Sequence, residues 1–292
     1  MNMRSRLSSY LNLTKPTIML LVGLTGASAL VMEGSLLSRP LEFMLAMLGL
    51  LLAGGSSNSF NQYFERDKDE LMERTRNRRP LPLHQIEPTH ALTFSILVGI
   101  LAVAIFAIIF NWLSALLSLA TILFYGLFYT LWLKPRTHLN IVIGGAAGAM
   151  APVIAWAAAS GSISWIAVVL FLVIFFWTPS HFWALAMCLK EDYRKVGLPM
   201  LPLVKGDEIT AKQILAYTLW TVAISLTLVF SKVGAIYLLA AVTLGILFIS
   251  KAKKLQRIPE VKEAGRLFGF SISYLMLLFV ALIVDTFINV RI

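Results

Sequence analysis

Long apolar runs separated by polar segments set the pattern of this chain. A helix needs about 20 predominantly apolar residues to cross the hydrocarbon core of a bilayer. We expect nine runs to form transmembrane helices, near residues 17–35, 41–63, 92–110, 113–133, 140–159, 163–188, 213–231, 233–250 and 267–288. The pattern therefore predicts an all-α polytopic membrane protein with nine transmembrane helices.

The composition supports the membrane class. Of the 292 residues, 58% are hydrophobic and 14% are charged. The mean hydropathy of +0.79 lies far outside the range of soluble domains. The single cysteine, Cys188, excludes an intramolecular disulfide framework. Because the first apolar run is long enough to span, we expect it to be kept rather than removed as a signal peptide.

Positive charges fall mainly on one side of the nine spans. With a cytoplasmic N-terminus, 22 of the 25 Lys and Arg lie in inside segments, and only Arg39, Lys232 and Arg291 lie outside. By the positive-inside rule, this asymmetry predicts that the N-terminus and the long loops face the cytoplasm. We expect a multi-pass protein of the cell inner (plasma) membrane whose chemistry, if any, faces the cytoplasm. We therefore assign the net charge of +10 to orientation and membrane lipid, and we expect no nucleic-acid partner.

The spacing of the loops predicts an internal repeat. Two long inside loops, at about 64–91 and 189–212, are displaced by four helices, and Lys15-Pro16-Thr17 is echoed by Lys134-Pro135-Arg136-Thr137. We expect one membrane-embedded domain over residues 1–292, with pseudo-repeat halves of about 1–133 and 134–250 and then a ninth helix. The alternative is that such loops alternate in any membrane bundle.

Several reaction classes are excluded by missing motifs. The chain has no GxxxxGK[ST] phosphate loop, no Cys or His cluster with zinc spacing, and no Gly-x-Ser-x-Gly elbow.

The strongest local signal is a polar series at the cytoplasmic end of the second run. If the helix continues through it, Asn61, Glu65 and Asp69 are spaced i, i+4, i+8 and share one face. Stacked oxygen ligands favour a cation between them, and hard oxygen ligands suit Mg²⁺ together with phosphate oxygens. The alternative is a solvated helix end in which Arg66 and Lys68 pair with their acidic neighbours.

Two more groups are candidates for chemistry. One or two arginines of the basic run at residues 73–80 could close over an anionic substrate, or the run could contact lipid headgroups nonspecifically. His181 and Trp183 lie two to three turns deeper than Glu191 and Asp192 in the sixth run. A His in a span is a functional candidate, although a neighbouring helix backbone could equally satisfy it.

The sequence resembles the UbiA-type intramembrane prenyltransferases, and within them the heme-modifying branch. Four separated blocks carry the resemblance in the right order: 13–17 (LTKPT); 61–69 (NQYFERDKD) with 72–78 (MERTRNR); 129–134 (YTLWLK) with Thr137 and 140–152 (NIVIGGAAGAMAP); and 181–186 (HFWALA) with 190–193 (KEDY) and 197–202 (GLPMLP). The resemblance covers essentially the whole chain. Glu65 departs from it by placing a longer carboxylate where Asp is usual.

The resemblance implies a UbiA-like bundle and a specific reaction. The farnesyl group of farnesyl diphosphate would be transferred to a vinyl group of heme b, with addition of water, giving heme O and diphosphate. Heme b would be a substrate rather than a permanent cofactor, Mg²⁺ would be the cofactor, and the product would supply a heme-dependent terminal oxidase pathway. The implied catalytic residues are Asn61, Glu65, Asp69, Glu191 and Asp192.

Metal ligands and substrate contacts are implied in the same way. The metal ligands would come from Asn61, Glu65, Asp67, Asp69 and Asp192. Substrate contacts would come from Lys15, Arg78, Lys134, Tyr129, Asn140, His181, Trp183, Lys190 and Tyr193.

Three alternatives stay open. A prenyltransferase acting on a quinone-precursor ring would share the diphosphate site. A secondary transporter would need acids near the bilayer midplane, whereas all acids except Glu33, Glu42 and Asp285 lie on the inside and none falls near the middle of a run. A heme-binding scaffold would fit His181 equally well.

Overall fold

The structure is a computed structural model that describes residues 3–231 and 233–288. Over these residues every regular element is helical, and nine helices are long and apolar enough to cross a membrane. The predicted all-α, nine-span architecture is confirmed. Lys232 and Arg291, two cations assigned to the outer side, lie outside the described residues.

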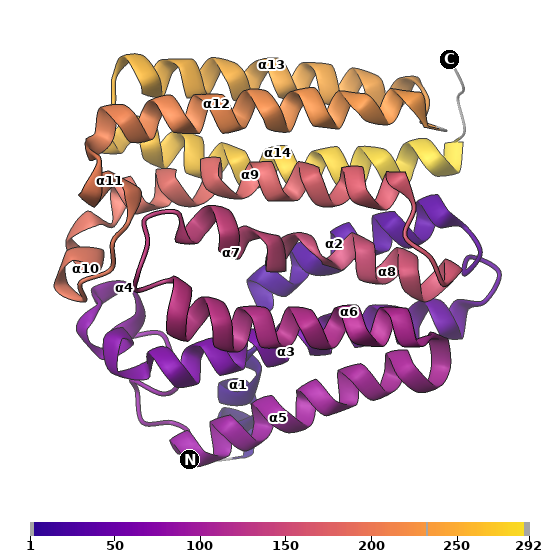
Figure 1. Ribbon diagram of the computed structural model, residues 1–292, viewed down its shortest axis with the longest axis horizontal. Coiled ribbons are helices and arrows are strands. Elements are labelled where there is room, and N and C mark those ends of the chain that lie inside the picture. The colour runs from indigo at the N-terminus through magenta and orange to yellow at the C-terminus, as the bar shows by residue number, and fades with distance from the viewer. Residues whose placement is uncertain (1–2, 232, 289–292) are drawn as a thin grey trace.

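The membrane helices follow the predicted order, and short helices lie between them (Figure 1). The spans are α2 (Pro16–Glu33), α3 (Pro40–Leu71), α5 (Pro88–Ile105) with the π-helix η1 (Phe106–Phe110), α6 (Trp112–Leu123) with the π-helix η2 (Phe124–Leu133), α7 (Asn140–Ala149) with α8 (Ala151–Ser160), α9 (Trp165–Cys188), α12 (Gly206–Leu226) with the 3₁₀-helix η3 (Thr227–Phe230), α13 (Ala235–Arg257) and α14 (Val261–Ile288). The short helices are α1 (Met3–Leu13), α4 (Glu73–Arg76), α10 (Lys190–Lys195) and α11 (Leu201–Val204).

Two helices extend beyond the apolar runs that predicted them, into polar sequence. Helix α3 continues to Leu71 instead of ending near residue 63, and α12 begins at Gly206 instead of near residue 213. The fifth span is divided at Met150, because Pro152 lacks the N–H that would continue the hydrogen-bond ladder from α7 into α8. Hydropathy thus predicted each span but not how far each helix extends beyond the apolar core.

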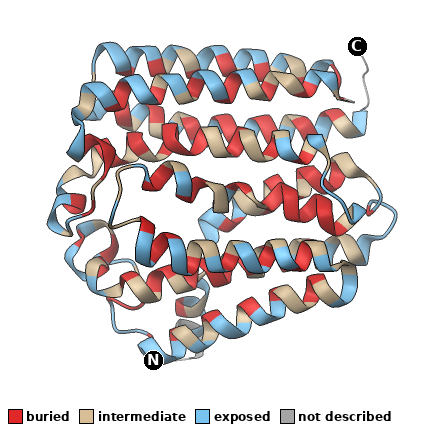
Figure 2. Cartoon of the chain, in the orientation of Figure 1, coloured by how far each residue is buried: buried red, intermediate tan, exposed pale blue. Residues whose placement is uncertain are grey.

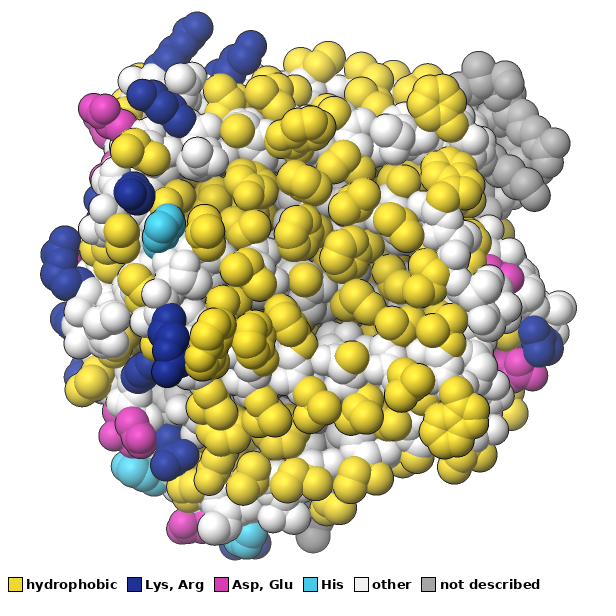
Figure 3. Space-filling model, in the orientation of Figure 1, with side chains coloured by type: hydrophobic (Ala, Val, Ile, Leu, Met, Phe, Trp, Pro, Cys, Tyr) yellow, Lys and Arg dark blue, Asp and Glu magenta, His cyan; other side chains and the backbone are white. Residues whose placement is uncertain are grey.

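The helices close into a ring. Helix α2 packs against α3, α8 and α14, so the first and last spans are neighbours. Buried residues concentrate on α7, α8 and α9 in the middle of the bundle (Figure 2). Charged side chains gather at the ends of the helices, mostly at the end that carries α4 and α10, and an apolar belt lies between the ends (Figure 3). The fold is that of a multi-pass membrane protein, and its division into two four-helix halves stays a prediction.

An acid at the opposite end of the bundle has a structural role. Asp285 is 1% exposed, and its carboxylate accepts hydrogen bonds from the N–H groups of Gly234 (2.5 Å) and Tyr237 (3.0 Å). The first turn of a helix has N–H groups without partners in the helix, so Asp285 satisfies two of them at the start of α13.

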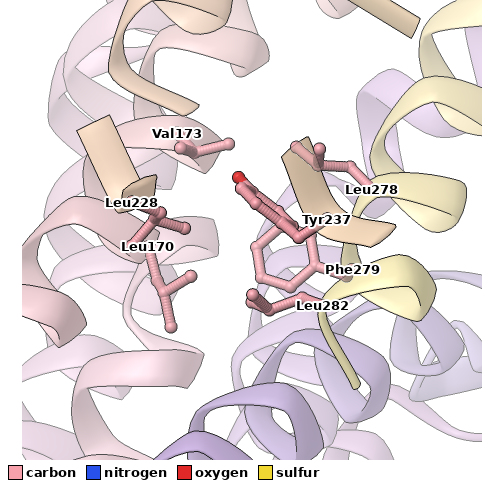
Figure 4. Close-up of a pocket in the computed structure, with 7 residues that line it drawn as sticks. All are labelled: Leu170, Val173, Leu228, Tyr237, Leu278, Phe279 and Leu282. Atoms are coloured by element: carbon pink, nitrogen blue, oxygen red, sulfur yellow. The ribbon is translucent and has the colours of Figure 1, made fainter. Parts of the chain in front are cut away.

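A small apolar pocket without room for a water molecule lies beside the start of α13 (Figure 4). Its lining is Leu170, Val173, Leu228, Tyr237, Leu278, Phe279 and Leu282. The Tyr237 hydroxyl, the one polar group of this lining, already donates to the Ser225 carbonyl at 2.9 Å. The site expected from the sequence lies at the charged end of the bundle instead.

Candidate active site

The polar series of the second span lies on a single helical face. Because α3 is continuous through Leu71, Asn61, Glu65 and Asp69 stand one turn apart, as the spacing predicted. Their exposed fractions are 2%, 6% and 2%. We call these three residues the acid face. A solvated helix end would leave them exposed, so their burial favours a built site.

Each member of the acid face contacts a cation from a different segment. Lys15 Nζ donates to Asn61 Oδ1 at 2.8 Å. Lys134 Nζ donates to Glu65 Oε1, and Arg79 Nη1 donates to Asp69 Oδ2. The same Arg79 nitrogen lies 3.8 Å from Glu65 Oε2. The cluster therefore opposes two carboxylates with three cationic side chains.

Burial, with the nearby positive charge, lowers the pKa of Lys15. Burial lowers the pKa of its ammonium well below the usual value, and the charge of Arg79 lowers it further, while Glu65 raises it. Lys15 also has a left-handed backbone (φ 56°) immediately before Pro16 at the start of α2. This conformation is unfavourable for a non-glycine residue. Contacts with the surrounding structure therefore hold the Lys15 backbone in it.

The π-helix η2 supplies the second wall of the cluster. Its wider winding places residues five apart on one face, and the Lys134 N–H donates to the Tyr129 carbonyl at 2.8 Å. Thr130 Oγ1 accepts from Asn61 Nδ2 at 3.2 Å and donates to the Tyr125 carbonyl at 2.7 Å. The rings of Tyr125 and Tyr129 stack at 5.2 Å between centroids. This winding brings an aromatic pair and a lysine to the acid face.

Asn140 holds the segment that follows Lys134. Its Nδ2 donates to the Thr137 carbonyl at 2.6 Å and lies 3.4 Å from the Lys134 carbonyl. Its Oδ1 is buried without a partner among the described residues. Asn140 thus links the end of η2 to the start of α7, and its Oδ1 can still accept a hydrogen bond.

The second acid-containing segment approaches the first through the backbone. Asp192 is 7% exposed, and its two carboxylate oxygens accept from the N–H groups of Glu73 and Arg74, both at 3.1 Å. Tyr193 beside it is buried, and this burial raises the pKa of its phenol. Lys190 Nζ pairs with Asp207 at 2.5 Å. Asp192 and Tyr193 therefore face the protein, whereas Lys190 joins α10 to α12.

His181 and Trp183 face helix contacts deeper in the bundle. His181 Nδ1 lies 2.7 Å from Ser271 Oγ, and its ring stacks between Trp177 and Phe268 at centroid distances of 4.4 and 4.6 Å. Trp183 meets Tyr217 edge to face at 5.3 Å. Both rings are buried, as expected from the sequence, but their described partners lie on α9, α12 and α14 rather than in the acid-face cluster.

Three further sequence candidates lie apart from the cluster. The Asp67 side chain is 83% exposed and sits 3.5 Å from Arg66, because α3 turns it away from the acid face. Glu191 is exposed and pairs with Arg194, and Arg78 is exposed. Among the described residues, no three His, Cys, Asp or Glu side chains come together as a group that could hold a metal ion, so Asp67 and Asp192 do not join Glu65 and Asp69.

Within the basic run, Arg79 reaches the acid face, whereas the resemblance pointed to Arg78. Arg79 follows Arg78 directly, and both belong to the same basic run. The turn after α4, in which the N–H groups of Arg78 and Arg79 both donate to the Thr75 carbonyl, directs the two side chains differently. Position in the run gave no signal for choosing between them.

These contacts define a buried polar site at one end of a membrane bundle, with oxygen ligands facing a surplus of cations. Such a site suits a polyanion such as a diphosphate, bound by ammonium and guanidinium groups. The chain belongs to the UbiA prenyltransferase family, whose sequence profile matches residues 19–283. The resemblance seen in the sequence is confirmed.

Within that family, the chain is similar over nearly its whole length to protoheme IX farnesyltransferases. The chain is 49% identical over 282 residues to the protoheme IX farnesyltransferase of Gloeobacter violaceus, covering 96% of this chain and 92% of that one. It is 44% identical to the protoheme IX farnesyltransferase of Symbiobacterium thermophilum, covering 94% and 93%.

Solved structures share the fold. A digeranylgeranylglyceryl phosphate synthase structure superposes with a TM-score of 0.80 at 20% identity, covering 96% of this chain and 98% of that one. A UbiA homologue from Archaeoglobus fulgidus bound to DMAPP and Mg²⁺ superposes with a TM-score of 0.66 at 19% identity, covering 94% and 99%.

Proposed function

We propose that this chain transfers the farnesyl group of farnesyl diphosphate to a vinyl group of heme b, with addition of water, giving heme O and diphosphate. The observation that carries the proposal is the acid face opposed by Lys15, Lys134 and Arg79 in a buried site. The acceptor is supported by the similarity to protoheme IX farnesyltransferases over nearly the whole chain.

The three cations bind the diphosphate in this proposal. Each now contacts an oxygen of the acid face, and each can exchange that oxygen for a phosphate oxygen. Ionisation of the allylic C–O bond moves negative charge onto the leaving diphosphate. Cations that meet this charge in a buried site stabilise the transition state more than the ground state.

The donor set of the acid face fits Mg²⁺. Asn61, Glu65 and Asp69 supply amide and carboxylate oxygens, the hard ligands that Mg²⁺ prefers beside phosphate and water. These oxygens become available when Lys15, Lys134 and Arg79 turn to the diphosphate. A magnesium ion bound there supplies Lewis-acid neutralisation of the phosphate oxygens. Asp67 and Asp192 are left out of this ligand set, since the first is exposed and the second is occupied by backbone N–H groups.

The tyrosine pair supplies the neighbouring apolar surface. Tyr129 is 7% exposed and stacks on Tyr125. Ring faces attract a cation, and a buried wall excludes water that would capture it early. We propose that this pair borders the farnesyl chain at its reactive end. Its position next to Thr130, which contacts Asn61, supports this role.

The site is proposed to face the cytoplasm from the cell inner membrane. The excess of Lys and Arg in the segments on the side of α4 and α10 supports this orientation.

The test is the reaction itself. Purified protein in detergent is incubated with heme b, farnesyl diphosphate and Mg²⁺, and mass spectrometry is used to look for heme carrying a hydroxyethylfarnesyl group. Absence of this product together with prenylation of a quinone-precursor aromatic acid would assign the second candidate acceptor. Heme binding without turnover of either acceptor would favour a heme-binding scaffold.

A further inference from the structure

Asp192 joins two segments that are far apart in the sequence. Its oxygens accept from the backbone N–H groups of Glu73 and Arg74, 119 and 118 positions away. A second contact lies beside it, where Lys195 Nζ meets Glu73 Oε1 at 2.9 Å. The segment at residues 73–79, which we call the basic segment, is thereby held against α10.

The basic segment leads directly to the acid face. The Thr75 hydroxyl donates to the Asp69 carbonyl at 2.8 Å. The N–H groups of Arg78 and Arg79 donate to the Thr75 carbonyl at 3.0 and 2.9 Å, and the Arg79 guanidinium reaches Asp69 and Glu65. A carboxylate that fixes the start of this segment also fixes where Arg79 enters the cluster.

Arg74 gains a defined position from the same contact. Its N–H is held by Asp192, and its Nε is buried without a hydrogen-bond partner among the described residues. Burial raises the pKa of the neighbouring Tyr193 phenol and the charge of Arg74 lowers it, in keeping with the place of Arg74 beside α10. No acid is paired with it in the described part of the chain, which leaves this cation available to an anion.

The geometry points to Asp192 as a positioning residue that docks the basic segment over the site and so sets the places of Arg74 and Arg79. This inference rests on the proposed function for its substrate, farnesyl diphosphate. A carboxylate whose two oxygens each accept a backbone N–H is already satisfied by strong, charge-assisted bonds. Asp192 acts on the diphosphate through the two arginines and does not ligate the metal.

The docking is tested on the full chain in detergent, without substrate or Mg²⁺. Limited trypsin digestion followed by mass spectrometry measures the cleavage rate within residues 73–79 for wild type, Asp192→Ala, Asp192→Asn and the control Glu208→Gln. Glu208 is another acid at a helix start, and it is exposed. We expect cleavage to be at least about tenfold faster in Asp192→Ala, intermediate in Asp192→Asn, which keeps one acceptor oxygen, and unchanged in Glu208→Gln.

Kinetics then separate positioning from metal binding. For Asp192→Ala and Asp192→Asn we expect the KM for farnesyl diphosphate to rise about tenfold, with a smaller change in kcat and an unchanged Mg²⁺ concentration for half-maximal rate. Unchanged cleavage of the basic segment, or a tenfold higher Mg²⁺ requirement with normal cleavage, would overturn the inference. If Asp192→Ala does not fold, Asp192→Asn, which has nearly the same size, decides. Because the digestion needs no turnover, it gives an answer even where the proposed reaction fails.

Discussion

Lys134 Nζ donates to Glu65 Oε1 across 69 positions of sequence, and this contact joins η2 to α3. The two side chains are 15% and 7% exposed. The pair is therefore both a helix contact and a part of the proposed diphosphate site.

Replacing Lys134 by Met should destabilise the protein and stop the reaction. The change leaves Glu65 buried with only the more distant Arg79, and loss of one partner of a buried pair costs about 3 kcal/mol. We expect a lower unfolding temperature in detergent and at least about a 100-fold loss of farnesyl transfer.

The double variant Lys134→Met with Glu65→Gln separates the two effects. It removes both charges, so we expect most of the stability to return while activity stays low. An unfolding temperature of wild-type value in Lys134→Met would show that the pair does not hold η2 to α3.

Neighbouring arginines should behave differently. Arg79 contacts Asp69 and Glu65, whereas Arg78 is exposed. We expect Arg79→Ala to lower kcat/KM for farnesyl diphosphate by about 100-fold and Arg78→Ala to lower it by less than about threefold. Steady-state kinetics of the two variants, prepared side by side, check this, and equal losses would contradict the assignment of Arg79.

A methyl group at Gly144 should disturb the tyrosine wall. A Cβ built there would lie 2.3 Å from Tyr129 Cε2, while one at Gly148 on the same helix meets nothing within 4 Å. Overpacking of this kind costs about 1–3 kcal/mol or moves the ring. We expect Gly144→Ala to lower both the unfolding temperature and the rate of farnesyl transfer, and Gly148→Ala to change neither. Normal activity in Gly144→Ala would remove Tyr129 from the reactive end of the site.

Asp69→Asn should abolish turnover in a protein that still folds and inserts. The amide keeps the size of the side chain but loses the charge that would hold Mg²⁺, and we expect the rate to fall at least about 100-fold. Removing Mg²⁺ with EDTA should stop the wild-type enzyme, and added Mg²⁺ should restore it. Size-exclusion profiles and farnesyl transfer check the two parts, and full activity in Asp69→Asn would exclude the residue from the metal site.

The parts of the fold that the sequence predicts are those that depend on local composition. Each span needs a long apolar run, so all nine were visible in hydropathy. The end of α3 was not, because its last turns are polar and only Glu65 and Asp69 among them are buried against other segments. Asn61, Glu65 and Asp69 could be grouped from helical spacing alone, since all three lie on one regular helix.

The partners of the acid face needed the three-dimensional structure. Lys15 and Lys134 come from separate segments, and the choice between Arg78 and Arg79 depends on one turn of backbone. Asp192 contacts N–H groups, which every residue but proline has, so no residue type marks its partners. The residue types therefore indicated an anion and metal site, whereas the backbone conformation determines which of the charged side chains contact one another.

The contact between the first and last spans bears on how the protein is made. Ser28 on α2 lies 3.3 Å from the Phe279 carbonyl on α14, and Ser271 of α14 serves both Trp177 and His181 on α9. During synthesis at a translocon, α2 enters the bilayer early and meets lipid where α14 will later pack. A chain without the residues from Val261 onward would therefore leave the sides of α2 and α9 that face α14 without their protein partner.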